Sequence, residues 1–109
     1  MGYDLGLAAR CQDMLPQNPA ISQKKMFGGL AYLLNGNMAF GIHKDHLMVR
    51  VGPDAYDASM ELPETLPFDL TERSMKGWIL VSPAGLEEDG QLKEWVVSGL
   101  RFAESLPAK

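Results

Sequence analysis

Two histidines stand on either side of Lys44-Asp45, at positions 43 and 46. Imidazole nitrogens bind zinc, so His43 and His46 form the one local pair that resembles part of a metal site. A zinc site needs three or four protein ligands, and the sequence holds neither a third histidine nor a second cysteine to complete it. We therefore interpret the two histidines as solvated residues of a turn, and we expect no metal site and no cofactor.

The single cysteine, Cys11, would form a nucleophile-and-base pair if a histidine lay beside it. It falls on the apolar stripe of a predicted helix, and a buried free thiol is a packing residue with little reactivity. The acidic groups at 54–61 and 87–89 lie at helix starts and on polar helix faces, where carboxylates favour helix capping and solubility. No residue is singled out as catalytic, so the sequence favours a protein that is not an enzyme.

The composition fits one globular domain over residues 1–109, with 46% hydrophobic and 22% charged residues. Fourteen acidic against ten basic side chains give a net charge of -4, which repels polyanions, so we do not expect direct binding to nucleic acid. The first residues lack the basic start and apolar segment of a signal peptide, and no apolar run approaches the roughly 20 residues of a membrane span. We expect a cytoplasmic protein with no membrane contact.

Apolar residues at helical spacing predict a helix over 3–15. Next come two apolar runs, 26–34 and 37–42, joined by Asn35-Gly36, the dipeptide most favourable to a type I′ hairpin turn. A third apolar run, 47–51, follows after another polar turn. These segments predict a three-stranded antiparallel meander.

The second half of the chain predicts a short helix at about 53–60, two more strands at 68–70 and 77–81, and a last helix from 89 to about 106. The segment 61–67 is expected to be an irregular connector. The order is then helix, three-stranded meander, short helix, two strands and C-terminal helix. This order predicts an α+β fold in which helices pack on one face of an antiparallel sheet.

One register satisfies all three strands of the meander. Leu34 then lies opposite Asn37 and Ala31 opposite Phe40, because cross-strand partners share a face of the sheet. The predicted core face carries Phe27, Ala31, Leu33, Met38, Phe40, Ile42, Leu47, Val49 and Val51. A slip by one residue would turn this set outward, so the fold interpretation depends on the register.

The opposite face of the meander is the candidate binding surface. Gly28, Ala39 and Gly41 are small and predict a shallow trough there. The side chains expected to border the trough are Leu30, Tyr32, His43, Met48 and Arg50. This face is more apolar than solvent exposure favours, and Tyr, Met and Arg are enriched at interfaces. Either another part of the chain covers it, or it binds a protein partner, a second copy of the chain or a small ligand.

An ordered set of motifs runs through almost the whole chain. They are Lys25-Met26-Phe27-Gly28-Gly29, Asn35-Gly36, Leu47-Met48-Val49-Arg50-Val51, Pro67-Phe68, Arg73-Ser74-Met75-Lys76-Gly77-Trp78 and Leu92-Lys93-Glu94-Trp95. In order and spacing, from about residue 3 to 106, the chain resembles the N-terminal domain of the TfoX/Sxy competence-regulator family. The motif residues that this resemblance singles out are Met26, Phe27, Gly28, Gly29, Arg73, Gly77 and Trp78.

The resemblance implies an α+β domain like that of the type III secretion chaperones. It also implies an association with transcriptional regulation of natural competence in some bacteria. Full-length regulators of this family carry a second, C-terminal domain, so the resemblance is to a single-domain relative. The family has no catalytic residues to transfer to Arg50, Arg73 or Trp78, and the motif is interpreted as specifying a fold rather than a site.

Our leading hypothesis from the sequence is a non-enzymatic regulatory or protein-interaction module. It predicts a protein partner or a homodimer contact on the outer sheet face. The alternative is a small-ligand or metal-binding protein, or an enzyme, that uses the same face near Gly41 and His43.

Overall fold

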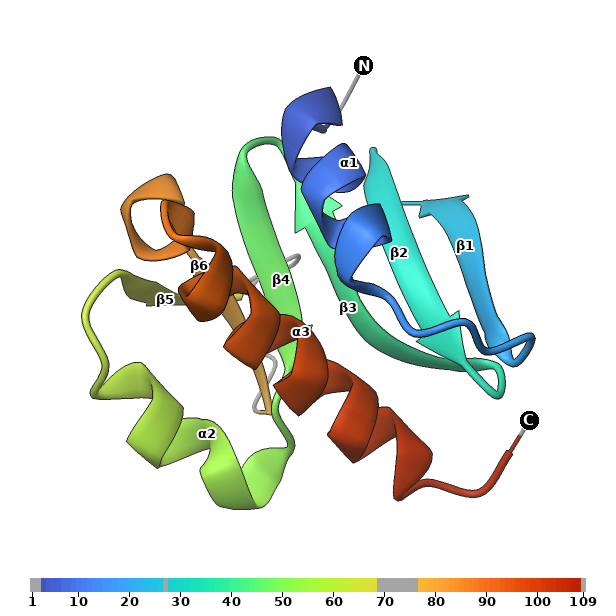
Figure 1. Ribbon diagram of the computed structural model, residues 1–109. Helices are drawn as coiled ribbons and strands as arrows, with labels where there is room; N and C mark the ends of the chain where they lie inside the picture. Colours follow the sequence, from blue (N-terminus) through green and yellow to red (C-terminus); the bar gives the residue numbers. More distant parts are fainter. Residues whose placement is uncertain (1–2, 27, 69–76, 109) are drawn as a thin grey trace.

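The computed structural model describes residues 3–26, 28–68 and 77–108. Within them, the elements in chain order are α1 (Leu5–Met14), β1 (Ile21–Met26), β2 (Gly29–Leu34), β3 (Asn37–His43), β4 (His46–Arg50), α2 (Pro53–Met60), β5 (Thr65–Pro67), β6 (Trp78–Val81), a 3₁₀ helix (Pro83–Leu86) and α3 (Asp89–Glu104). The strands form one antiparallel sheet in the order β1-β2-β3-β4-β6-β5. Helices α1 and α3 lie over one face of this sheet, and α2 lies beside β5 and β6 (Figure 1). The predicted α+β fold is confirmed.

Two tight hairpins form where the sequence predicts them. Asn35 and Gly36 both have positive φ angles, 54° and 82°, as a type I′ turn between β2 and β3 requires. Between β3 and β4, His43 pairs with His46, so the loop consists of Lys44-Asp45 alone. These turns bring three apolar strands side by side.

The strand β1 was not expected from the sequence. It pairs with β2 from Ile21 opposite Leu34 to Met26 opposite Gly29, and so extends the meander to four strands. Its middle residues, Ser-Gln-Lys-Lys, are exposed because β1 is an edge strand with one neighbour. Edge strands often carry lysines, which discourage pairing with other chains. The strand lacks the apolar alternation by which a half-buried strand is recognised.

The strands of the second half differ in their bounds from those expected. The segment 61–67, expected to be irregular, contains β5, which pairs with β6. The predicted strand 77–81 corresponds to β6, and the predicted last helix corresponds to α3. The predicted strand 68–70 does not begin at Phe68, which follows the end of β5, and the rest of it lies outside the described residues.

The predicted register fails at one place, in the middle of the β2–β3 pair. Leu33 lies opposite Met38 as expected, but Tyr32 lies opposite Phe40. The strand β3 therefore contributes one extra residue, Ala39, at a β-bulge. From Tyr32 back to Leu30, the observed pairing differs from the predicted pairing by one residue. The side chains of these residues therefore lie on the opposite face of the sheet from the one predicted.

The bulge decides which residues of β2 enter the core. The sheet residues of the core cluster are Leu30, Tyr32, Leu34, Ala39, Phe40, Ile42, Leu47, Val49, Val51, Ile79 and Val81. Ala31 is fully buried as predicted, but Ala31, Leu33 and Met38 do not belong to this cluster, because their positions alternate to the other face. The expected core residues of β4 are confirmed, and Phe27 lies outside the described residues.

Helix α3 covers the core, and its backbone packs closely against β3. Its core stripe, as we call it, consists of Leu92, Val96, Gly99 and Ala103, all buried. A Cβ atom added at Gly99 would lie 2.4 Å from the carbonyl oxygen of Ala39. The absence of a side chain at Gly99 therefore lets the helix backbone approach the bulge of β3.

Helix α1 covers another part of the same sheet face. Asp4 caps the helix, because its side chain accepts a hydrogen bond from the Leu7 N–H (3.1 Å). Cys11 is fully buried, as predicted, and burial raises the pKa of its thiol to about 12. The thiol is therefore protonated and unreactive at neutral pH. None of the helices in the described parts of the chain is long and apolar enough to cross a membrane.

Candidate functional site

The surface predicted on the outer sheet face is not assembled as expected. Leu30 and Tyr32, at 6% and 1% exposure, belong to the core on the helix-covered side. The reason is the bulge at Ala39, which shifts β2 by one residue relative to β3. The Tyr32 ring stacks on that of Phe40, with ring centroids 4.5 Å apart. Two of the five proposed contact residues are thus used for packing.

Two more of these residues are engaged by neighbouring parts of the chain. Met48 is fully buried, and a Cβ atom added at Gly41 would lie 2.7 Å from the Met48 methyl group. Met48 therefore fills the trough that the small residue was expected to leave. The Arg50 guanidinium lies 5.3 Å from the ring centroid of Trp78 and 5.3 Å from that of Phe102, in cation–π contact with both.

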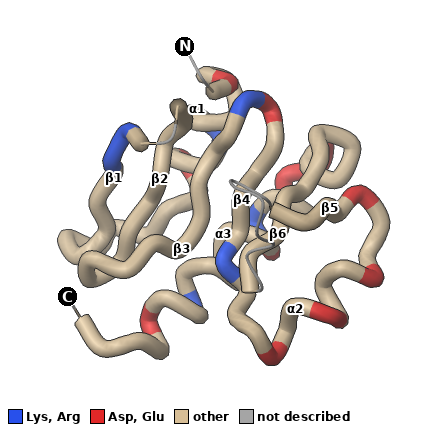
Figure 2. Tube along the Cα trace, turned by 180° about the vertical axis from the view of Figure 1, so that it is seen from behind, with Lys and Arg blue, Asp and Glu red and all other residues tan. Residues whose placement is uncertain are grey.

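The histidine pair is formed, since His43 lies opposite His46 in the β3–β4 hairpin. Asp45 Oδ1 lies 2.8 Å from His46 Nδ1. Among the residues that the structure describes, no group of three or more His, Cys, Asp or Glu side chains is arranged to hold a metal ion. Figure 2 views the sheet from its outer side, where β2 and β3 carry no charged residue. The outer side of these two strands therefore offers few groups for chemistry.

The family-motif residues that the structure describes serve turns and strand ends. Met26 is the last residue of β1, and Gly28, two positions later, has a φ of 73°, in the region that favours glycine. Gly77 has a φ of 102° and precedes β6. Phe27 and Arg73 lie outside the described residues. Gly28 and Gly77 of the motif therefore shape backbone turns, whereas Trp78 begins β6 and its ring contacts Arg50.

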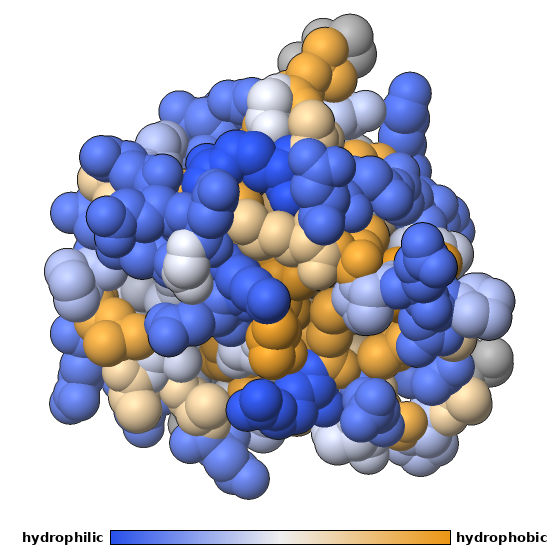
Figure 3. Space-filling model, viewed as in Figure 1, coloured by the Kyte–Doolittle hydropathy of each residue, from blue (hydrophilic) through white to orange (hydrophobic). Residues whose placement is uncertain are grey.

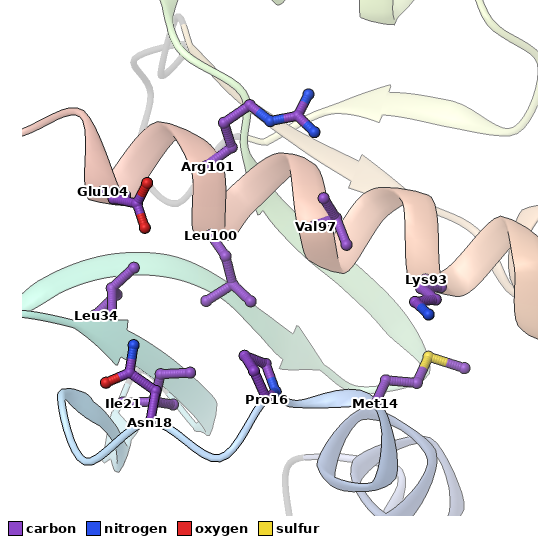
Figure 4. Close-up of a pocket in the computed structure, with 10 residues that line it drawn as sticks. All are labelled: Met14, Pro16, Asn18, Ile21, Leu34, Lys93, Val97, Leu100, Arg101 and Glu104. Carbon is purple, nitrogen blue, oxygen red and sulfur yellow. The ribbon is translucent and has the colours of Figure 1, made fainter.

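A hollow of about 510 Å³ lies on the helix side of the sheet, between α1 and α3 (Figure 4). We call it the α1–α3 groove. Its lining residues are Met14, Pro16, Asn18, Ile21, Leu34, Lys93, Val97, Leu100, Arg101 and Glu104. In Figure 3, apolar residues are visible in the middle of this helix-covered face, with hydrophilic residues around them. The groove thus combines apolar walls with charged residues along α3.

The groove exists because α1 and α3 touch at one end and diverge toward the other. The Arg10 guanidinium donates a hydrogen bond to the carbonyl oxygen of Leu86 (2.7 Å) and forms an ion pair with Asp89 (3.1 Å), at the start of α3. Helix α1 ends at Met14, and Pro16 cannot continue it. Figure 1 shows α3 continuing across the sheet while the chain after α1 runs toward β1. The groove lies between these two segments.

Five residues of α3 line the groove, Arg101 among them. The other four form one row, which we call the groove stripe: Lys93, Val97, Leu100 and Glu104. Residues three and four positions apart lie on the same side of a helix. In Figure 4 the Leu100 side chain points from α3 into the groove, and Val97 is 36% exposed. The charged ends of the stripe lie about 16 Å apart along the helix axis. The stripe is thus apolar in its middle and charged at both ends.

The charges of the groove stripe are not paired within the described parts of the chain. Neither Lys93 nor Glu104 forms an ion pair there, and both side chains are exposed. Glu104 is the last residue of α3, where the partial negative charge of the helix end disfavours a carboxylate. The stability of α3 therefore does not explain why an acidic residue stands at this position.

Sequence reasoning missed Val97 and Leu100. The apolar pattern that stands out in α3 is the core stripe, and these two residues lie about 100° around the helix from it. The signal that points to them is a second apolar pair on an amphipathic helix, with charges at matching spacing on both sides. No local pattern in the sequence shows that α1 leaves this side of α3 uncovered.

The structure defines a class of protein: an α+β domain with helices over one face of an antiparallel sheet and an open groove between two of them. Residues 13–103 match the TfoX N-terminal domain family, and the chain belongs to this family. The match includes all six strands and α3 up to its last residue but one, and it confirms the resemblance carried by the sequence motifs. Comparisons with curated proteins and with solved structures gave no match.

Proposed function

We propose that this chain is a non-enzymatic regulatory module that acts by binding protein in the α1–α3 groove. The observation that carries the proposal is the groove itself, an open hollow of about 510 Å³ with apolar walls and the exposed side chain of Val97 at its edge. Protein interfaces combine an apolar centre with a polar rim, and the groove has both. The link to transcriptional regulation that the family resemblance implies supports the regulatory part of the proposal.

The groove supports this function better than the outer sheet face does. On that face the expected contact residues are engaged already, since Tyr32 packs in the core, Met48 is buried and Arg50 contacts two rings. Val97, by contrast, is exposed and lies outside the core stripe of α3. A partner can bury it without displacing any part of the chain.

A photocrosslinking amino acid at position 97 tests the proposal in cells that express the full chain. We expect a discrete covalent adduct whose partner residue is identified by mass spectrometry. The matched control is the same amino acid at Leu62, which is 49% exposed and does not line the groove. No adduct from position 97, or the same adducts from both positions, would overturn the proposal.

A second candidate is the binding of a small apolar ligand in the same groove. Its volume of about 510 Å³ falls in the range of roughly 300–1,000 Å³ that is typical of small-molecule sites. Native mass spectrometry of the purified chain separates the two candidates. A bound molecule of low mass that is lost in the variant V97E supports the ligand, and its absence leaves the groove to a protein partner.

A further inference from the structure

We infer that the partner in the α1–α3 groove is a second copy of this chain, whose α3 packs antiparallel to the first. The inference rests on the function proposed above, because it assigns an occupant to the same groove. It is carried by the groove stripe, which is complementary to itself in both charge and apolar character.

The groove stripe is symmetric about one point of α3. Lys93 and Glu104 lie at equal separations from the midpoint of the stripe, and so do Val97 and Leu100. A two-fold axis through this midpoint places Lys93 of one copy against Glu104 of the other, and Val97 against Leu100. Each contact then occurs twice. A closed two-fold interface, the commonest in soluble homo-oligomers, requires such self-complementarity.

The spacing of the stripe also fits a contact between two helices. Successive members are four, three and four residues apart, the pattern that keeps one side of a helix facing a partner helix. In the proposed dimer, the α3 of the second copy packs along the groove stripe at the open mouth of the groove, and its side chains enter the hollow. The apolar pairs lie at the centre of the contact and the charged pairs at its ends, as in known interfaces.

Charge favours a second copy over a partner of uniform charge. One end of the groove stripe is basic, at Lys93, and the other carries Glu104, with Arg101 beside it. A uniformly acidic partner would therefore meet the like charge of Glu104, and a uniformly basic one would meet those of Lys93 and Arg101. The net charge of -4 makes two copies repel each other overall, and the two Lys93–Glu104 pairs oppose this repulsion locally. The partner's lysine also offsets the unfavourable position of Glu104 at the end of α3.

Reversal of single charges tests this arrangement. K93E brings two carboxylates together at both ends of the contact, and E104K brings two ammonium groups together. Because each change affects two pairs, we expect each variant to raise the dimer dissociation constant about tenfold or more. Sedimentation equilibrium over a series of concentrations measures this constant. E104K makes the net charge less negative, so a general charge effect would tighten the association where the inference expects it to weaken.

The equimolar mixture of K93E and E104K is the decisive sample. In the mixed dimer both ends again join opposite charges, so it is expected to form at concentrations where neither variant associates alone. Native mass spectrometry, with one variant labelled with ¹⁵N, distinguishes the mixed dimer by its mass. The double variant K93E/E104K is expected to associate like the unmodified chain. An unmodified chain that stays monomeric at every concentration, or a mixture no better than its components, would overturn the inference.

The matched control is E94K, a charge reversal at the next residue of α3, which is exposed and lies outside the groove stripe. It is expected to associate like the unmodified chain, and circular dichroism with thermal unfolding verifies the fold of every variant. A monomeric chain that crosslinks from position 97 to a different protein would overturn the dimer and leave the proposed function standing. A monomeric chain without any adduct from position 97 would overturn both.

Discussion

The two apolar stripes of α3 stand in opposite situations on one helix. The core stripe is buried against β3 and β4, where Gly99 lets the helix approach the carbonyl oxygen of Ala39. The groove stripe lies beside an open hollow, with Val97 exposed and Leu100 half-buried. The two rows differ because the sheet lies under one of them, whereas α1 diverges from the other.

This difference separates stability from binding within one element. Apolar surface stabilises by about 25 cal/mol for each Å² removed from water, so the core stripe makes its contribution when the chain folds. The exposed part of the groove stripe makes the same kind of contribution only when a partner covers it. One helix can therefore hold the fold together and offer a contact surface without compromising either role.

The largest predicted effect comes from shortening one side chain in each stripe. Leu92→Ala removes fully buried atoms and is expected to lower the free energy of unfolding by about 2–5 kcal/mol. Val97→Ala shortens an exposed side chain of the same helix and is expected to change it by less than about 0.5 kcal/mol. Urea unfolding at low protein concentration, where association contributes little, measures both. Equal losses in the two variants would contradict the distinction between the stripes.

A smaller effect is expected from two glycines of α3. Alanine favours a helix over glycine by up to about 1 kcal/mol, so Gly90→Ala, where an added Cβ meets no atom within 4 Å, is expected to stabilise the chain. At Gly99 the added Cβ would lie 2.4 Å from the carbonyl oxygen of Ala39, and we expect a net loss of about 1–3 kcal/mol. Thermal unfolding should shift in opposite directions for the two variants. Shifts in the same direction would show that α3 is not held tightly on the bulge.

The helices and hairpins were predictable from the sequence where the spacing of apolar residues indicates which side of an element is buried. Helical spacing predicted α1 and α3, and turn residues with flanking apolar runs predicted the hairpins. The bulge at Ala39 was not predictable, because β2 reads Gly-Leu-Ala-Tyr-Leu-Leu and has no polar residue to mark either face. Both registers place apolar side chains in the core. Leu30 and Tyr32 therefore lie in the core and not on the expected outer surface because of this bulge.

The groove depends on the relative placement of two helices that lie far apart in the sequence. Arg10 of α1 reaches Leu86 and Asp89 at the start of α3, and these contacts determine where the helices meet and where they separate. No periodicity within either helix encodes such a contact. The sequence does contain the groove stripe, but only the structure shows that this side of α3 is left open.

A further prediction, a dependence of stability on pH, concerns two ionisable groups in the closed core. Burial raises the pKa of Cys11 from 9.0 to about 12 and is the main reason that the pKa of Tyr32 rises from 10.0 to about 12. In the unfolded chain both groups lose their protons at lower pH, so the folded state holds more protons in this range. The stabilisation that these two groups contribute is therefore fully present below about pH 9. It is lost as the pH rises toward 12, and the free energy of unfolding falls by up to about 1.4 kcal/mol per pH unit for each group.

Two variants of α1 assign this alkaline loss to the closed side of the helix. Cys11→Ala removes the buried thiol and is expected to make the free energy of unfolding fall less steeply between about pH 9 and pH 12. Met14→Ala, on the side of α1 that lines the groove, removes no ionisable group and is expected to leave the slope unchanged. Urea unfolding at several pH values measures the slopes. An unchanged slope in Cys11→Ala would mean that the thiol titrates alike in both states, and that α1 does not seal the core at this position.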